Sequence, residues 1–389
     1  MKEGWKSVKL GEIADVKMGQ SPQGSSFNNL GKGFPFLQGN RTFGHKFPTV
    51  DTWTTSVTKV ANKGDVLMSV RAPVGDLNIA ASDFCIGRGV CAIKAKNNEQ
   101  EFLYYLMKFI VPVLRQNSNG TTFASVNRSD IENVNIDLPP LSVQKRIAAV
   151  LGALDDKIEL NRKMNKNLEE QAQALYKSWF IDFEPFGGKM PKEWKRVPLD
   201  EYVNFQEGPG IRNWQYVNED GIKFINIRCI TDGDINTSNA NMISKEEAFG
   251  KYAHFMLREN DIVMSCSGTL GRYAIVRADH LPLCLNTSVI RFWPKIISEQ
   301  LPWLYGYLSS NEFLKQQKSF ANGSAQVNFG PTHLKRMYVV APNNDAIIKY
   351  HTIARPIIRK MLTCKYESRK LAEMRDALLP KLMSGEVEV

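Results

Sequence analysis

Apolar side chains recur at alternating spacings of four and three along two long segments of the chain. The first series is Ile147, Leu151, Leu154, Ile158, Asn161, Asn165, Leu168, Ala172, Leu175 and Trp179, and a shift of 203 residues gives Tyr350, Ala354, Ile357, Met361, Cys364, Ser368, Leu371, Arg375, Leu378 and Leu382. This is the spacing of a heptad seam, so it predicts two helices of equal length, each roughly 48 Å long if straight.

Both seams are polar at the same place. Asn161 and Asn165 in the first seam correspond to Cys364 and Ser368 in the second. Polar residues inside a seam cost stability but specify the register of two helices. The matching centres therefore favour an antiparallel pairing of the two helices over separate packing of each helix on its own globular domain.

Shorter segments also recur, and they keep the same order in both halves of the chain. The pairs are residues 5–14 with 194–203, 64–75 with 260–271, 102–104 with 303–305, 119–121 with 322–324, and 138–139 with 341–342. The offset between the copies rises only in small steps, from 189 to 203 residues. Such a series indicates an internal duplication whose copies differ by a few loop insertions.

Each copy combines short β-rich segments with a helix. Strands are predicted at residues 66–70, 90–94, 134–137, 223–227, 262–265, 288–292 and 337–340, and helices at 101–114 and 302–318. The predicted fold class is α+β, with two similar globular mixed α/β domains separated by two long antiparallel coiled-coil helices and a pseudo-two-fold axis. The predicted globular domains are 1–143 and 184–343, and the predicted long helices are 144–183 and 344–389.

Two similar globules held apart by helices of fixed length suit a partner with two sites at a set separation. Duplex DNA is such a partner, because half-sites recur on one face of it every ~34–36 Å. The net charge of +10 also favours a polyanion. The excess of Lys and Arg is spread along the chain, as expected for folded surfaces that meet a long polyanion.

Loops rich in Gly, Ser and Asn recur at matching places in both copies. Asn, Gln and Arg side chains read adenine and guanine edges, while backbone amides of such loops bind phosphates. The candidate DNA-binding residues are Gln38, Asn40, Arg41, Arg71 and Arg128 in the first copy, and Asn226, Arg228, Ser267, Arg272, Asn322 and Gln326 in the second. Any single loop is also consistent with an ordinary turn, and recurrence in both copies is what favours binding.

The composition, with 43% hydrophobic and 23% charged residues, is that of a folded protein. No apolar stretch approaches the roughly 20 residues needed to span a bilayer, and the first nine residues lack an apolar signal core. The six cysteines form no C-x-x-C pair, which indicates reduced thiols and not a disulfide framework. We expect a cytoplasmic protein with no membrane partner.

The sequence offers no motif for catalysis. It lacks a phosphate-binding G-x-x-x-x-G-K-[ST] loop, a glycine-rich dinucleotide fingerprint and an amino-methyltransferase motif, and its five histidines lack metal-ligand spacing. Asp155 and Asp156, on the first long helix, are interpreted as a solvated pair, since helix neighbours point in different directions. The chain is therefore predicted to be non-catalytic, with no catalytic residue, no metal and no cofactor of its own.

Several runs of residues carry a family resemblance. They are residues 10–14 (LGEIA) leading to 19–22 (GQSP), residues 138–147 (LPPLSVQKRI), Asn161-Arg162, and residues 375–385 (RDALLPKLMSG). With the duplicated order, the chain resembles the specificity subunit of type I restriction–modification systems over essentially its full length. The second copy departs from the pattern, because residues 207–209 (EGP) stand in place of Gly-x-Ser-Pro and two asparagines follow Pro342.

The resemblance implies that each globule is a target recognition domain that reads one half of a split, asymmetric DNA sequence. It implies that the helices set the spacer between the halves and dock two methyltransferase (modification) subunits, which bind S-adenosylmethionine and flip adenine out for methylation. It further implies restriction subunits that use ATP and Mg to translocate and cleave double-stranded DNA. The chain itself would be the non-catalytic subunit of this complex.

Two alternatives remain open on the sequence. One is a self-sufficient DNA-modifying enzyme, which requires a cofactor motif that the sequence lacks. The other is a non-catalytic coiled-coil adaptor that binds nucleic acid or protein without bipartite sequence specificity. Preference for one bipartite duplex over scrambled DNA distinguishes the resemblance from the adaptor.

Overall fold

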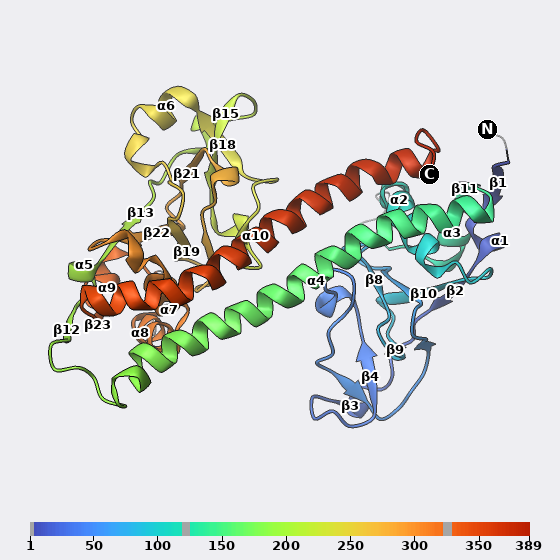
Figure 1. Cartoon of the computed structure of the whole chain (residues 1–389). Helices are drawn as coiled ribbons and strands as arrows, with labels where there is room; N and C mark the ends of the chain where they lie inside the picture. Colours follow the sequence, from blue (N-terminus) through green and yellow to red (C-terminus); the bar gives the residue numbers. More distant parts are fainter. Residues whose placement is uncertain (1–3, 119–124, 322–328) are drawn as a thin grey trace. The chain divides into compact units, whose positions relative to one another are not determined.

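The chain forms two compact units in the computed structural model, which describes residues 4–118, 125–321 and 329–389 (Figure 1). Unit 1 comprises Met1–Asn161 and Glu367–Val389, and unit 2 comprises Arg162–Tyr366. Unit 1 is therefore assembled from two segments that are far apart in the sequence.

Unit 1 contains an antiparallel sheet of order β2-β10-β7-β8, a sheet of order β3-β5-β4-β9-β6 in which β4 and β9 are parallel, and the antiparallel pair β1-β11. The strands are β1 Lys6–Lys9, β2 Ala14–Met18, β3 Phe27–Asn28, β4 Phe34–Leu37, β5 Trp53–Thr54, β6 Val60–Ala61, β7 Val66–Ser69, β8 Leu77–Ile79, β9 Phe84–Ile86, β10 Val90–Ala95 and β11 Asn135–Leu138. The shorter helices are α1 Leu10–Ile13, α2 Gln100–Ser118 and α3 Arg128–Glu132, with 3-10 turns η1 Gly24–Ser26 and η2 Asn40–Thr42.

The sheet around β7 lies between two apolar clusters in unit 1. Val66 and Met68 point to the cluster that contains α2 and parts of the two long helices, whereas Leu67 points to the cluster beneath β4 and β9. Side chains alternate between the faces of a strand, so a strand that is buried on both faces is apolar at every position. This is why residues 66–68 of β7 form a continuous apolar run and not an alternating one.

Unit 2 repeats this plan. The strands are β12 Lys195–Pro198, β13 Val203–Glu207, β14 Tyr216–Val217, β15 Gly221–Ile225, β16 Ile230–Thr231, β17 Asp234–Ile235, β18 Asn241–Ser244, β19 Ile262–Ser265, β20 Tyr273–Ile275, β21 Leu283–Leu285, β22 Val289–Pro294 and β23 Tyr338–Ala341. The shorter helices are α5 Leu199–Tyr202, α6 Lys245–Phe249, α7 Leu301–Ser309, α8 Asn311–Ala321 and α9 Pro331–Leu334, with 3-10 turns η3 Glu184–Phe186, η4 Asn213–Gln215, η5 Ile227–Cys229, η6 Ala253–Phe255, η7 Ala278–His280 and η8 Ser298–Gln300.

Strand order and register confirm the internal duplication. The order β2-β10-β7-β8 returns as β13-β22-β19-β20, and the pair β1-β11 returns as β12-β23. The parallel pair in which Phe36 lies beside Cys85 returns as Phe224 beside Cys284. Unit 2 adds the hairpin β16-β17, for which unit 1 has no paired strands among its described residues.

The two seams form the long helices α4 Leu141–Phe180 and α10 Asn344–Met383, each of 40 residues (Figure 1). Each helix contributes one part to each unit. In unit 1, Arg375 of α10 binds Asp155 of α4, and Asn161 donates to Glu367 at 2.9 Å. Residue numbers rise along one helix as they fall along the other, so the pairing is antiparallel, as predicted.

The same direction holds in unit 2. The Sγ of Cys364 lies 3.5 Å from the Sδ of Met164, and Lys365 Nζ lies 3.2 Å from a carboxylate oxygen of Glu169. The predicted fold class, with its duplicated mixed domains and antiparallel long helices, is thus confirmed.

The polar seam residues lie at the helix pairing. Asn161 and Cys364 are buried, and Asn165 and Ser368 are half-buried. The Oδ1 of Asn165 and the Oγ of Ser368 are buried without a hydrogen-bond partner among the residues that the structure describes. Their role in setting the register stays a prediction.

Two details of the sequence interpretation are wrong. Asp155 is not solvated: it is fully buried, while Asp156 beside it is exposed, because neighbours on a helix point about 100° apart and only Asp155 faces α10. The helix predicted at 302–318 is two helices that meet at Ser310. The Oγ of Ser310 accepts from Phe313 N at 3.2 Å, so this serine caps a new helix.

Candidate nucleic-acid interface

Four loops of unit 1 meet around the turn at residues 87–89. They are residues 19–23, 38–41, 71–75 and 87–89, which we term loop surface 1. The backbone hydrogen bonds that join them are Gln20 N to Ile86 O (2.9 Å), Gly87 N to Leu37 O (2.8 Å), Gly89 N to Gln38 O (3.2 Å) and Val70 N to Gly89 O (3.0 Å). The GQSP run at residues 19–22 and the loops that carry the candidates Gln38 and Arg71 therefore form one surface.

The corresponding loops of unit 2 are also joined by backbone hydrogen bonds, and the bonds Gly87 N to Leu37 O and Val70 N to Gly89 O have direct counterparts there. Loop surface 2 consists of residues 208–210, 226–228, 267–271 and 286–288. The hydrogen bonds are Gly208 N to Val289 O (3.3 Å), Thr287 N to Pro209 O (3.2 Å), Asn286 N to Ile225 O (3.1 Å) and Cys266 N to Ser288 O (3.0 Å). The framework of the surface is thus present twice, once in each unit.

One glycine in each surface allows the closest backbone approach. A Cβ on Gly19 would lie 2.2 Å from the carbonyl oxygen of Gly87, and a Cβ on Gly208 would lie 2.5 Å from that of Asn286. Neither position accepts a side chain without movement of the backbone. The second copy therefore keeps the required glycine even though it lacks the Gly-x-Ser-Pro run.

A buried serine holds the third loop of each surface. Ser69 Oγ donates to Pro73 O at 2.7 Å and accepts from Asp76 N at 2.9 Å. Ser265 Oγ donates to Thr269 O at 2.6 Å and accepts from Arg272 N at 3.0 Å. The backbone of this loop is the same in both copies, although an aspartate in one copy stands where the other has an arginine.

The candidate side chains of loop surface 1 differ in whether they are free to contact DNA or are already hydrogen-bonded within the protein. Gln38 and Arg71 are exposed. Asn40 donates to Asp76 at 2.6 Å. Arg41 makes two hydrogen bonds to Asp51, at 2.6 and 2.9 Å, which raise the pKa of Arg41 and lower that of the Asp51 carboxyl. A phosphate would therefore have to displace Asp51 from Arg41.

In loop surface 2, Arg228 and Arg272 are exposed and Ser267 is half-buried. Asn226 accepts from Arg228 N at 2.9 Å and so caps the 3-10 turn η5. Its carboxamide NH₂ group remains as the donor that this side chain could offer to a base.

Arg128 lies outside the residues of both loop surfaces. Arg128 begins α3 and donates to Glu132 at 2.7 Å in an i,i+4 pair, and its role in DNA binding stays a prediction. Asn322 and Gln326 lie outside the described residues.

The sequence interpretation missed Arg88, which occupies the turn at the centre of loop surface 1. Its backbone N donates to Ser21 Oγ at 3.2 Å, its side chain is exposed, and its counterpart in unit 2 is Thr287. A Gly-Arg-Gly run directly after the apolar residues 84–86 was the available signal. Glycines on both sides let the turn pass close to Gln38, which places the arginine between two other loops.

The described part of the chain offers no obvious site for other chemistry. Residues 4–118, 125–321 and 329–389 bring together no three His, Cys, Asp or Glu side chains in a manner suited to a metal ion. All six cysteines are buried with free thiols. No helix within these same ranges has the length and apolar character required to cross a membrane.

Comparison with known proteins gives a consistent family. The family model described as "Type I restriction modification DNA specificity domain" matches residues 2–170 and 191–350. A putative type I restriction enzyme MjaX specificity subunit of Methanocaldococcus jannaschii is 42% identical over 177 residues, which cover 44% of this chain and 42% of that protein. The type I restriction enzyme MjaIX specificity subunit of the same organism is 25% identical over 409 residues, covering 99% of this chain and 94% of that protein.

A solved structure shows the same fold. The type I restriction–modification system S subunit from M. genitalium superposes with a TM-score of 0.59 at 18% sequence identity. The match covers 97% of this chain and 96% of that one.

Proposed function

Because the chain belongs to the family of type I restriction–modification DNA specificity domains, we propose that it is the DNA-recognition subunit of a type I restriction–modification complex. Each unit reads one half of a bipartite, asymmetric DNA sequence. The chain supplies recognition, and the chemistry belongs to its partner subunits.

The observation that carries this proposal is a repeated framework with different side chains on it. Backbone bonds and a buried serine build the same loop surface twice. At matched positions the side chains differ: the exposed Arg71 is replaced by the half-buried Ser267, and the exposed Arg88 by the exposed Thr287. Two surfaces of one shape but different donors and acceptors suit one duplex with two different half-sites.

On each surface, cationic side chains and loop amides bind phosphates, while Arg, Asn and Gln contact base edges. An arginine that binds guanine through two hydrogen bonds contributes about 1–3 kcal/mol of discrimination against a wrong base. Phosphate contacts make the affinity fall steeply with salt.

The parts of the chain divide accordingly. Residues 1–143 and 184–343 are the recognition domains, and residues 144–183 and 344–389 are the helices that set the spacer and dock two methyltransferase subunits. Those subunits bind S-adenosylmethionine, and restriction subunits bind ATP and Mg. The complex acts in the cytoplasm on double-stranded DNA.

The test is long-read detection of methylated adenines in cells that carry the chain, its methyltransferase partner, or both. A split motif is expected only when both are present. An active methyltransferase without any split motif that depends on this chain would overturn the proposal and favour the adaptor.

A graft variant sharpens the test. Gln38→Asn, Arg71→Ser and Arg88→Thr together place residues of loop surface 2 on the framework of loop surface 1. The first half-site of the motif is expected to change, while the second half-site stays as the internal control.

A further inference from the structure

Each loop surface continues directly into a short segment that reaches the long helices. In unit 1 this segment is residues 44–46, and in unit 2 it is residues 232–234. The parallel strand pairs place Phe36 and Phe224 at the same position, and the two segments follow at the same distance along the chain. We call them tether 1 and tether 2.

Tether 1 is fixed on one side to the sheet. The side chain of Asn78, which is buried, accepts from Gly44 N at 3.0 Å and donates to Gly44 O at 2.9 Å. Ile79 N donates to the carbonyl oxygen of Lys46 at 2.8 Å. The tether therefore moves together with the sheet that carries loop surface 1.

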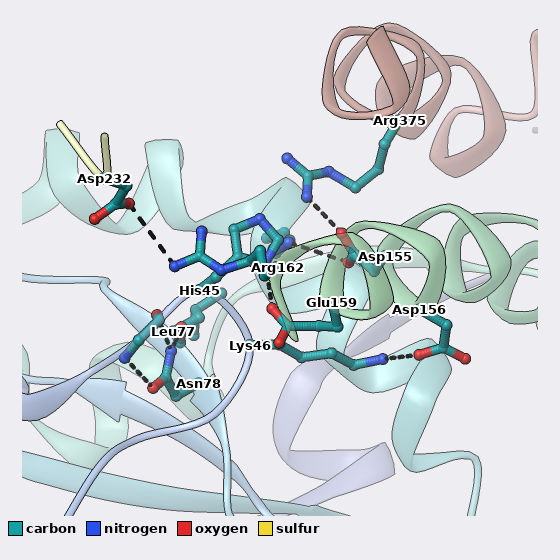
Figure 2. A network of polar contacts seen from close by, with 12 residues as sticks. His45, Lys46, Leu77, Asn78, Asp155, Asp156, Glu159, Arg162, Asp232 and Arg375 are labelled. Atoms are coloured by element: carbon teal, nitrogen blue, oxygen red, sulfur yellow. Dashed lines mark hydrogen bonds and ion pairs between the residues drawn. The ribbon is translucent and has the colours of Figure 1, made fainter. Parts of the chain in front are cut away.

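On its other side, tether 1 holds α4 through one hydrogen bond and one ion pair (Figure 2). His45 Nδ1 lies 2.9 Å from Glu159 Oε1, and Lys46 Nζ lies 2.7 Å from Asp156 Oδ1. The two carboxylates are three residues apart on α4, so they lie on the same side of the helix and hold the tether at two points.

Tether 2 makes equivalent polar contacts with different residues. Lys365 of α10 donates to Gly233 O at 2.7 Å, and Arg162 of α4 lies 3.7 Å from Asp232, as Figure 2 also shows. Within the unit, Asp234 is held by Arg277 and His280. In both units the tether thus contacts a long helix at the corresponding position, but the side chains that make the contact differ in type.

A cavity adjoins each tether at the same place. In unit 1 a cavity of about 360 Å³ is lined by His45 together with Tyr104 and Lys108 of α2. In unit 2 a cavity of about 350 Å³ is lined by Gly233, Tyr273 and Glu169. The space beside each tether is thus not completely filled by side chains, and the polar contacts above link the tethers to the helices.

From this duplicated arrangement we infer that the tethers are positioning elements that set the accepted spacer length. This inference rests on the proposed function. Half-sites on one duplex must be met at a fixed distance and a fixed rotation, since one helical turn of DNA is about 34–36 Å and 10–10.5 base pairs. One base pair is therefore about 3.4 Å. A recognition surface that shifts by this amount and turns by about one tenth of a full turn fits a spacer that is one base pair longer or shorter.

The test is the variant Asp156→Ala/Glu159→Ala in the full-length chain, expressed with its methyltransferase and read by long-read methylation sequencing. Both half-sites are expected to keep their bases, while sites whose spacer differs by one base pair become methylated to at least about one tenth of the level at native sites. The wild type is expected to leave such sites unmethylated.

Two further variants separate positioning from stability. Glu170→Ala removes an exposed carboxylate from α4 away from tether 1, and it is expected to keep the native spacer. The single variant Glu159→Gln leaves Asp156 unchanged and retains an acceptor for His45. It is expected to accept a narrower range of spacer lengths than the Asp156→Ala/Glu159→Ala variant. The thermal midpoint of each variant verifies that the fold is intact.

The outcomes are distinct. A folded Asp156→Ala/Glu159→Ala variant that keeps only the native spacer, or that loses methylation equally at all spacers, would overturn the role of tether 1. A wild type that yields no split motif would overturn the proposed function and this inference with it.

Discussion

Unit 1 contains a buried ionic cluster where α2, α4 and α10 meet. Asp155 accepts a hydrogen bond from Tyr105 at 2.9 Å, binds Arg375 and lies 3.5 Å from Lys108 (Figure 2 shows Asp155 with Arg375). Burial raises the pKa of Asp155, but the charges of Lys108 and Arg375 outweigh it and hold the pKa below its usual value. Asp155 is thus the buried anion that two cations share.

The substitution Asp155→Asn keeps the shape of the side chain and removes its charge. Lys108 and Arg375 would then lie close together at a mostly buried site without Asp155 as a counter-ion. Removal of one partner from a buried ion pair costs about 3–5 kcal/mol. Since each ~1.4 kcal/mol is a factor of ten, the opening equilibrium of this helix pairing should rise roughly 100- to 4,000-fold.

Hydrogen exchange with mass spectrometry measures this change locally. Amides of α4 at residues 147–158 and of α10 at residues 371–382 are expected to lose protection, while α7 in unit 2 keeps it. Glu132→Gln is the control, because it breaks the Arg128–Glu132 pair at the surface, which should cost no more than about 1 kcal/mol. A loss of less than 1 kcal/mol for Asp155→Asn would refute the reasoning.

The repeat supplies a second comparison. Shifted by 203 residues, Asp155 corresponds to Ile358 and Arg375 corresponds to Ala172, which are both buried and apolar. Replacing a whole buried ion network by apolar residues is often neutral or stabilising. At the offset of 201 residues that relates 102–104 to 303–305, Lys108 corresponds to Ser309. The triple variant Asp155→Ile/Arg375→Ala/Lys108→Ser, which removes all three charges, is therefore expected to be more stable than Asp155→Asn.

Three further predictions concern single residues. Burial raises the pKa of Asp234, but Arg277 and His280 lower it to about 2. The carboxylate therefore contributes its full stabilisation above pH ~3.9, the pKa of an unfolded aspartate, and this contribution is lost as the pH falls towards 2. Thermal midpoints between pH 5 and 2 should decline less steeply in Asp234→Asn than in the wild type. Arg88→Ala should relax one base of the first half-site in methylation maps, whereas Arg128→Ala should leave the motif unchanged. Asn161→Ala removes the hydrogen bond to Glu367 and should lower the free energy of unfolding in urea by roughly 0.5–1.5 kcal/mol. A denaturation midpoint equal to that of the wild type would contradict this prediction.

Much of the fold could be predicted because it depends on periodicity and repetition. The seams gave both long helices, and every predicted strand lies within two residues of an observed one. The strand predicted at 223–227 ends early at Ile225, because Asn226 caps a 3-10 turn with its side chain. Local side-chain chemistry of this kind shifts boundaries without changing the order of elements.

The rest depends on contacts between residues that are distant in sequence. Two-residue strands such as β5 and β6 exist only because neighbouring strands pair with them. The burial of Asp155 is decided by Arg375, which lies 220 residues further on. Arg88 is central only because three other loops fold around it. The eleven candidate residues chosen from the sequence therefore included neighbours of Arg88 but not Arg88 itself.

The division of unit 1 into two segments has a consequence for synthesis on the ribosome. Leu382 and Met383 belong to the same apolar cluster as Ile147 and Leu151, and all of unit 2 is translated between the two pairs. At about 5–20 residues per second, those roughly 200 residues take about 10–40 s to emerge. During that time the apolar face of α4 in unit 1 has no α10 to cover it, so a nascent chain of this protein exposes this apolar face until α10 emerges.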